Sequence, residues 1–235
     1  MPPATQAGLN LSPEEVASSG SAVPLNPFAD MTAQAGGGRE VIANPALAEI
    51  HAPIGLPDII MGSPDAPVTI VEYASPSCPY CKRFHTEVYP GLKRDYIDTG
   101  KVRYILRDFP IGRTSGQASV ALRCIAPEKY LELFGRFLAE QPSWVSQEVR
   151  IEPIAAVAAR SGLSSAAFDA CRQDAALIAG LKAEKDRGRK LGIIGTPNFF
   201  IQDQRVKKAL DSVELRALID PLLAARTASA SVAHP

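Results

Sequence analysis

Residues 68–81 have the sequence VTIVEYASPSCPYC, which predicts a β-strand that passes directly into an α-helix. The segment from Val68 to Ala74 is nearly continuous in apolar and β-branched character, a pattern typical of a strand near the middle of a sheet. A short break rich in serine and proline follows, and Pro79 suits the first position of a helix. Cys78 and Cys81 are therefore expected to lie at the junction between the strand and the helix.

This placement predicts redox chemistry for the two cysteines. Cys78 is expected at the helix N-cap, where unpaired backbone N–H groups and the positive end of the helix dipole favour a thiolate and lower the thiol pKa. Cys81 lies one turn further on, close enough to form a disulfide with Cys78 and more deeply placed, as suits a resolving thiol. We expect Cys78 to be the exposed attacking group, Cys81 the resolving group, and the Cys78–Cys81 disulfide to be the redox centre, with no further cofactor.

A pair of cysteines at this spacing is also half of many zinc sites. The second half is missing here, because Cys124 and Cys171 are far apart in the sequence. The three histidines, which supply no compact ligand pair, are His51, His85 and His234. We therefore expect no bound zinc, while binding of Cu(I) by two soft thiolates remains an alternative to catalysis.

The chain after this junction alternates between helix and strand patterns. Phe84, Val88 and Leu92 recur at four-residue spacing and continue the helix that begins at Pro79. Residues 101–108 alternate in the manner of a second strand. Together these segments predict a strand, helix, strand unit.

A block of helices follows over about residues 114–180, where apolar residues keep the helical period. Gly195-Thr196-Pro197 then introduces a strand over 198–201, with an edge strand expected around 205–207. Asp211 and Glu214 form a capping box before the last helix. The predicted fold class is α/β, with a helical domain inserted into it.

Residues 1–52 are rich in Pro, Ala, Gly and Ser, and we interpret them as a flexible N-terminal lead to a domain over 53–235. The alternative is an oligomerisation segment, for which Leu47, Ile50 and Ile54 would supply a small apolar stripe.

Composition limits the classes of partner. The 25 basic and 25 acidic residues cancel, so no long-range field would collect nucleic acid or an anionic membrane. No apolar run approaches the roughly 18 residues that span a bilayer, and the first residues resemble no signal peptide. The chain is therefore expected either to be cytosolic or to have lost an export signal.

The combination of Cys78-Pro79-Tyr80-Cys81 after a strand and Gly195-Thr196-Pro197 before another resembles the thioredoxin superfamily. The inserted helices are similar to those of DsbA-like proteins, and the resemblance covers about residues 57–225. It implies a thioredoxin fold with a helical insertion over about 114–180.

The resemblance also assigns roles around the cysteines. Pro197 matches a cis proline that faces the active-site disulfide, and Thr196 would offer backbone groups to a substrate peptide. Glu72 matches a buried acid thought to move protons to and from the inner thiol, and its burial would make the charged form costly. The alternatives are a trans turn proline at Pro197 and a glutamate on the exposed face of an edge strand at Glu72.

Cys124 and Cys171 fall on two different predicted helices. Two buried free thiols are one interpretation, and a structural disulfide, as in some alphaproteobacterial DsbA proteins, is the one we prefer. Closing this loop would stabilise the fold by roughly 4 kcal/mol. A second disulfide would place the mature chain in the periplasm, with its signal peptide removed.

The implied activity is that of a dithiol oxidase, which introduces disulfides into reduced or unfolded exported proteins and is reoxidised by a DsbB-like membrane protein. Tyr80 stands where strong oxidases commonly have histidine, which predicts a less oxidising potential. Thr196 is found in many isomerase-like members, so an oligomeric isomerase or reductase remains the alternative, although a monomer is favoured. We expect Trp144 and His85 to be structural, as a helix-junction cap and a solvated helix residue.

Overall fold

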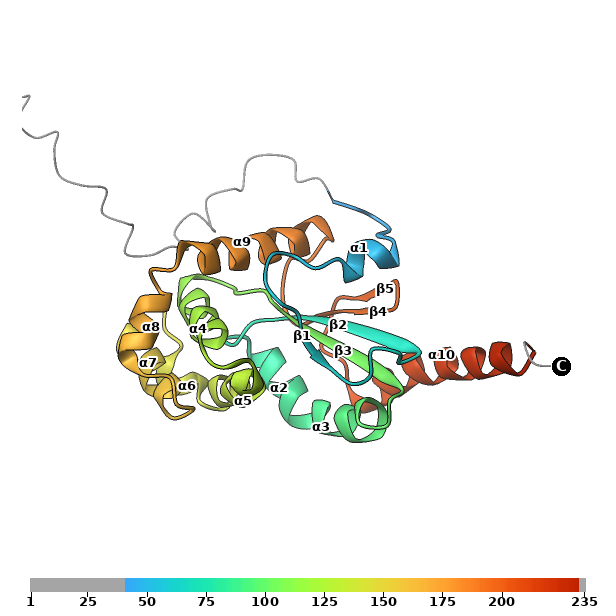
Figure 1. Ribbon diagram of the computed structural model, residues 1–235. Coiled ribbons are helices and arrows are strands. Elements are labelled where there is room, and N and C mark those ends of the chain that lie inside the picture. The colour runs from blue at the N-terminus through green and yellow to red at the C-terminus, as the bar shows by residue number, and fades with distance from the viewer. Residues whose placement is uncertain (1–40, 233–235) are drawn as a thin grey trace, which may run out of the picture.

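A computed structural model describes the chain over residues 41–232, and its centre is a five-stranded mixed sheet in the order β1-β3-β2-β4-β5 (Figure 1). The strands are β1 (Ile59–Met61), β2 (Val68–Ala74), β3 (Val102–Asp108), β4 (Asn198–Ile201) and β5 (Gln204–Val206). β2 pairs in parallel with β3 and antiparallel with β4, and its seven residues are all buried. The predicted central strand is confirmed, whereas the three-residue β1 was missed because it is too short to show a period.

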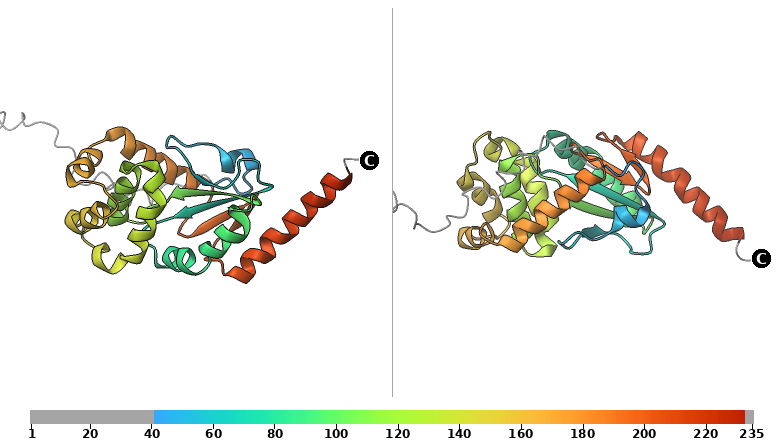
Figure 2. Two further views of the ribbon diagram at one scale, coloured as in Figure 1. Left: turned by 60° about the horizontal axis from the view of Figure 1, so that its bottom comes forward. Right: turned by 90° about the horizontal axis from the view of Figure 1, so that it is seen from above.

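Helices cover both faces of this sheet (Figures 1 and 2). One face carries α1 (Leu47–His51) and α9 (Ala175–Lys190), and the other carries α2 (Pro79–Glu87), α3 (Tyr89–Leu92) and α10 (Ser212–Val232). Side chains of a strand alternate between faces, so Val71 and Tyr73 pack toward α1 and α9. Ile70 belongs to the opposite core, as do Phe84 of α2 and Ile219 of α10. Glu72 has the parity of Ile70 and therefore faces α2.

The helical insertion lies at one end of the sheet (Figure 2). It contains α4 (Arg113–Cys124), a 3₁₀ turn (Pro127–Lys129), α5 (Tyr130–Ala139), α6 (Gln141–Trp144), α7 (Ile151–Ala159) and α8 (Ser165–Cys171). Trp144 is fully buried and donates a hydrogen bond to the Phe137 carbonyl at 2.9 Å, which confirms its structural role.

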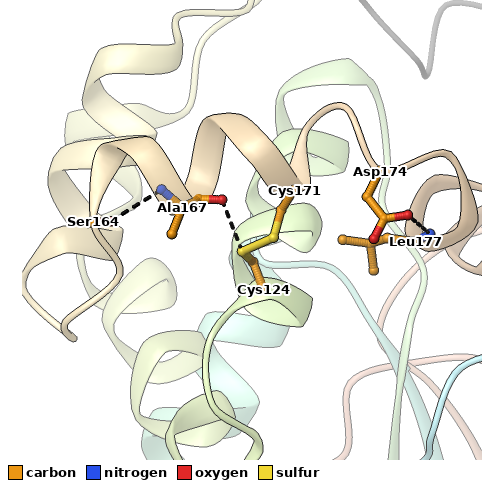
Figure 3. The surroundings of a disulfide bond; sticks show 6 residues. All are labelled: Cys124, Ser164, Ala167, Cys171, Asp174 and Leu177. Atoms are coloured by element: carbon orange, nitrogen blue, oxygen red, sulfur yellow. Dashed lines mark hydrogen bonds between the residues drawn. A yellow bond between two sulfur atoms is a disulfide. The ribbon is translucent and has the colours of Figure 1, made fainter.

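Cys124 at the end of α4 and Cys171 at the end of α8 form a disulfide, as preferred from the sequence (Figure 3). Two side-chain caps lie beside it. Ser164 accepts from the Ala167 N–H at the start of α8, and Asp174 accepts from the Leu177 N–H at the start of α9. The disulfide thus joins the first and last helices of the insertion, where the chain turns back toward the sheet.

The folded unit begins before residue 53, contrary to the predicted extent of the lead. Residues 1–40 lie outside the described residues, but Ile50 of α1 is fully buried against the sheet. The buried Arg107 guanidinium explains this, because it donates to the carbonyl of Ile50 at 2.7 Å and to that of Ala52 at 3.1 Å. Since Ile50 packs inside its own domain, it cannot form part of an exposed apolar stripe.

The last helix begins as predicted. Asp211 accepts from the N–H groups of Val213 and Glu214 at 2.8 Å, and the Glu214 carboxylate accepts from the Asp211 N–H at 3.2 Å, which completes the capping box. Within residues 41–232, no helix has the length and apolar character that crossing a bilayer requires.

Candidate functional site

The two cysteines of the CPYC sequence lie where strand β2 passes into helix α2, and both are free thiols. Cys78 is the N-cap of α2, and its sulfur accepts from the Cys81 N–H at 3.4 Å. Pro79 occupies the first helical position, where no backbone N–H is required. The local placement predicted from the sequence is confirmed.

The prediction that Cys78 is exposed is wrong. Cys78 retains 2% of its surface and Cys81 none. The loop before β4 covers the sulfur of Cys78, which lies 3.1 Å from the Thr196 carbonyl oxygen. A small part of the Cys78 surface is therefore open to solvent, while Cys81 is fully enclosed.

The pKa values of the two thiols are shifted in opposite directions. A hydrogen bond from the Cys81 thiol lowers the pKa of Cys78 to about 6, against the effect of burial. Thr196 and the backbone N–H groups of Cys81 and Tyr80 add to the lowering. Burial raises the pKa of Cys81 well above the usual range, and the hydrogen bond with Cys78 and the charge of Glu72 raise it further. Near neutral pH the reduced pair therefore consists of a thiolate at Cys78 and a thiol at Cys81.

The Thr196–Pro197 peptide bond is cis, and the loop that contains it packs against the cysteine pair. This geometry excludes the trans turn proline. A groove of about 350 Å³ runs past the same loop and is lined by Tyr80, Ile194 and Lys207, among others. Tyr80 is 56% exposed and Ile194 is 86% exposed. The groove thus presents two exposed apolar side chains beside the loop that covers Cys78.

Glu72 is fully buried on β2, which excludes the alternative of an exposed edge glutamate. Its Oε2 accepts a hydrogen bond from the Tyr104 hydroxyl of β3 and lies 2.8 Å from Nε2 of His85 on α2. Its Oε1 is buried and has no partner among the described residues. The expectation that His85 is a solvated helix residue is wrong, since its side chain is only 9% exposed and contacts Glu72. The sheet register brings Glu72 beneath the face of α2 that carries His85.

Gln141 of α6 is a further residue at the site that the sequence did not reveal. Its amide Nε2 donates to the carbonyls of Pro76 and Cys78, each at 3.0 Å, and the side chain is buried. These two bonds hold the turn before α2 against the helical insertion. No local sequence signal marks this residue, because its partners lie more than 60 positions earlier in the chain.

Within residues 41–232, no group of three or more His, Cys, Asp or Glu side chains is arranged to hold a metal ion.

Comparison with known proteins agrees with this geometry. The family described as Thioredoxin matches residues 56–221. The structure of Wolbachia pipientis alpha-DsbA1 is 30% identical, with a TM-score of 0.68, and the alignment covers 74% of this chain and 95% of that one. A putative protein-disulfide oxidoreductase from Rickettsia bellii is 33% identical over 147 residues, which cover 61% of this chain and 56% of that protein. Disulfide bond formation protein D of Bacillus subtilis is 24% identical over 178 residues, covering 68% of this chain and 75% of that protein.

The chain thus spans little more than half the length of the curated Rickettsia relatives that it matches. The family match itself extends over 166 of the 235 residues and includes β2, the cysteine pair, the helical insertion and the cis-proline loop. The sheet order, the disulfide in the insertion and the alpha-DsbA1 likeness agree with it. The chain therefore belongs to the thioredoxin family and is DsbA-like in its fold.

Proposed function

We propose that the chain is a protein-disulfide oxidoreductase that oxidises pairs of thiols in exported proteins through Cys78 and Cys81. The observation that carries the proposal is the opposite shift of the two thiol pKa values, to about 6 for Cys78 and well above the usual range for Cys81. A thiolate at Cys78 is a good leaving group, and its stabilisation favours the reduced enzyme, which makes the disulfide form an oxidant.

The proposed reaction begins when a substrate thiolate attacks the Cys78 sulfur of the oxidised enzyme. The Cys78–Cys81 bond breaks, its electron pair goes to Cys81, and Cys81 takes up a proton. A second substrate thiolate then attacks the substrate sulfur of the mixed disulfide, and Cys78 leaves as a thiolate. The substrate gains one disulfide, and the enzyme gains two electrons.

The surroundings of the cysteines support roles for three further residues. The Thr196 carbonyl lies 3.1 Å from the Cys78 sulfur, and Thr196 and the cis residue Pro197 are proposed to hold the substrate backbone beside that sulfur. Glu72 is proposed to exchange the proton of Cys81, because its charge already raises the pKa of that thiol. Tyr80 and its neighbours in the groove offer apolar contact to the segment around the substrate cysteine.

The proposed location is the periplasm, with a DsbB-like membrane protein as the reoxidant and reduced exported proteins as substrates. The Cys124–Cys171 disulfide supports an oxidising compartment, since structural disulfides rarely persist in the cytosol. The Wolbachia alpha-DsbA1 likeness supports the same assignment.

Equilibration with glutathione tests the direction of the reaction. The expected potential is more oxidising than the value of about −270 mV for thioredoxin but less oxidising than the value of about −120 mV for DsbA. The oxidised chain should also form a disulfide in a dithiol peptide, and Cys78→Ser should not. A potential near that of thioredoxin would contradict an oxidase.

Sedimentation of the full chain and of a chain that begins at residue 41 distinguishes the oligomeric isomerase hypothesis from the oxidase hypothesis. Truncation at residue 41 retains Ile50 and the carbonyls that Arg107 binds, which a start near residue 57 would remove. A monomer in both cases supports the oxidase. Titration with Cu(I), beside insulin reduction and dithiol oxidation, separates a metal binder, which would catalyse neither reaction.

A further inference from the structure

Glu72 is buried with its two carboxylate oxygens in unequal surroundings. Oε2 receives two contacts, from the Tyr104 hydroxyl and from Nε2 of His85. Oε1 has no partner among the described residues. A buried carboxylate oxygen without a donor is costly, and such exceptions call for a functional explanation. Oε1 is therefore the oxygen of Glu72 that is available to a proton.

We propose that His85 connects Glu72 to solvent, so that the proton exchanged between Cys81 and Glu72 enters and leaves the buried site through the imidazole ring. This inference rests on the function proposed above and adds a residue to it. His85 acts on Cys81 only through Glu72, so it is a positioning and proton-exchange residue.

The ring of His85 is held in place on several sides. It stacks on Tyr89 of α3 with ring centroids 5.0 Å apart, and it makes T-shaped contacts with Phe84 of α2 and Phe134 of α5 at centroid distances of 5.4 and 5.0 Å. These contacts keep Nε2 directed at Glu72. The side chain of His85 is 9% exposed, so this residue reaches the surface although Glu72 does not.

The other titratable groups beside Glu72 are poor proton carriers near neutral pH. Burial raises the pKa of Tyr89 to about 12, and burial and the charge of Glu72 raise the pKa of Tyr104 well above the usual range. Both phenols therefore stay protonated, and the Tyr89 hydroxyl is itself buried without a partner among the described residues. Imidazole can release a proton from one ring nitrogen while it takes one up at the other, which suits a relay between a buried group and solvent.

The step can be followed in the direction of enzyme oxidation. The Cys78 thiolate attacks oxidised glutathione, its S–S bond breaks, and one glutathione leaves as a thiolate. Cys81 must then lose its proton to Glu72 before its sulfur attacks the Cys78 sulfur and displaces the second glutathione thiolate. The proton passes from Glu72 through His85 to water. The first attack does not require Cys81 to lose its proton, whereas the second attack does.

Quenched-flow mass spectrometry of the reduced chain with oxidised glutathione resolves these two steps. In His85→Ala, formation of the mixed disulfide should proceed at the wild-type rate, while its resolution should slow by about tenfold, below the roughly 100-fold effect of losing an acid–base group itself. Free imidazole added to His85→Ala should restore most of the lost rate. A purely structural role for His85 would not respond to imidazole.

Two variants complete the test. Thr86→Ala lies on the exposed side of the same helix and should resolve the mixed disulfide at the wild-type rate. His85→Gln keeps a hydrogen-bond donor toward Glu72 but cannot relay a proton, so it should resolve the mixed disulfide as slowly as His85→Ala. If the alanine variant does not fold, the glutamine variant alone tests the proton relay. A wild-type rate in His85→Gln, or a slow His85→Ala that imidazole does not restore, would overturn the inference while leaving the proposed function intact. A wild-type chain that cannot be oxidised by glutathione would overturn both.

Discussion

Replacing Cys81 by alanine is expected to raise the pKa of the Cys78 thiol from about 6 to about 7. The hydrogen bond from the Cys81 thiol is the main contribution that lowers this pKa, and alanine removes it. The backbone N–H of residue 81, 3.4 Å from the Cys78 sulfur, remains in the variant. The pKa of Cys78 in the alanine variant should therefore rise but stay below the pKa of a free cysteine.

The size of the effect follows from the value of one hydrogen bond. A weak thiol donor to a thiolate is taken as about 1.4 kcal/mol, which corresponds to about one pKa unit. With a pKa of about 6, roughly nine-tenths of Cys78 is thiolate at pH 7. In the alanine variant about half should be thiolate at that pH, and the ionised fraction should fall further as the pH is lowered.

The assay is the rate of alkylation by iodoacetamide as a function of pH, with product measured by mass spectrometry. Cys124 and Cys171 are joined in a disulfide, so Cys78 is the one free thiol in a Cys81 variant. Cys81→Ser retains a side-chain donor to Cys78, so the pH midpoint of alkylation in this variant should stay near the value of about 6 expected with the hydrogen bond in place. The reasoning is refuted if the alanine variant titrates at or below pH 6, or if serine and alanine give the same midpoint.

Three further predictions concern stability and potential. Replacing both Cys124 and Cys171 by alanine opens a loop with a sequence separation of 47 and should lower the free energy of unfolding, measured in urea, by roughly 4 kcal/mol. The pH midpoint of Cys78 alkylation should not change. An unchanged urea midpoint of unfolding would show that other contacts constrain the loop. Arg107→Leu should lower the free energy of unfolding by about 3–5 kcal/mol, because it leaves the half-buried Asp58 carboxylate and the carbonyls of Ile50 and Ala52 without their donor. The same change at the exposed Arg113 should stay within about 0.5 kcal/mol, and equal losses at the two positions would count against the Arg107 network. Tyr80→His should make the reduction potential, measured by equilibration with glutathione, more oxidising. The expected change is about 30 mV for each 1.4 kcal/mol of added thiolate stabilisation. A less oxidising potential would contradict the role assigned to residue 80.

Local patterns predicted the elements that carry the chemistry. A strand buried on both faces, a break and a proline at the first helical position suffice to place Cys78 at an N-cap, because capping depends on neighbours within one turn. The capping box at Asp211 and Glu214 is predictable for the same reason. The cis-proline loop and the disulfide partners came from the likeness to a family, since no local rule pairs residues separated by 47 positions.

Tertiary structure decided how these elements meet. His85 and Glu72 are 13 positions apart and Tyr104 lies 32 positions after Glu72, yet all three converge because β2 and β3 share a register and α2 crosses their face. A helical period predicts only that one side of α2 is buried, and it cannot show which side chain meets a carboxylate. The shielding of Cys78 by the loop before β4, and its support by Gln141, likewise depend on segments more than 60 positions away. Burial and hydrogen bonding at the site depend on how distant segments pack together. The helix start that places Cys78 at a thiolate-stabilising N-cap depends only on neighbouring residues, so it is already encoded in residues 68–81.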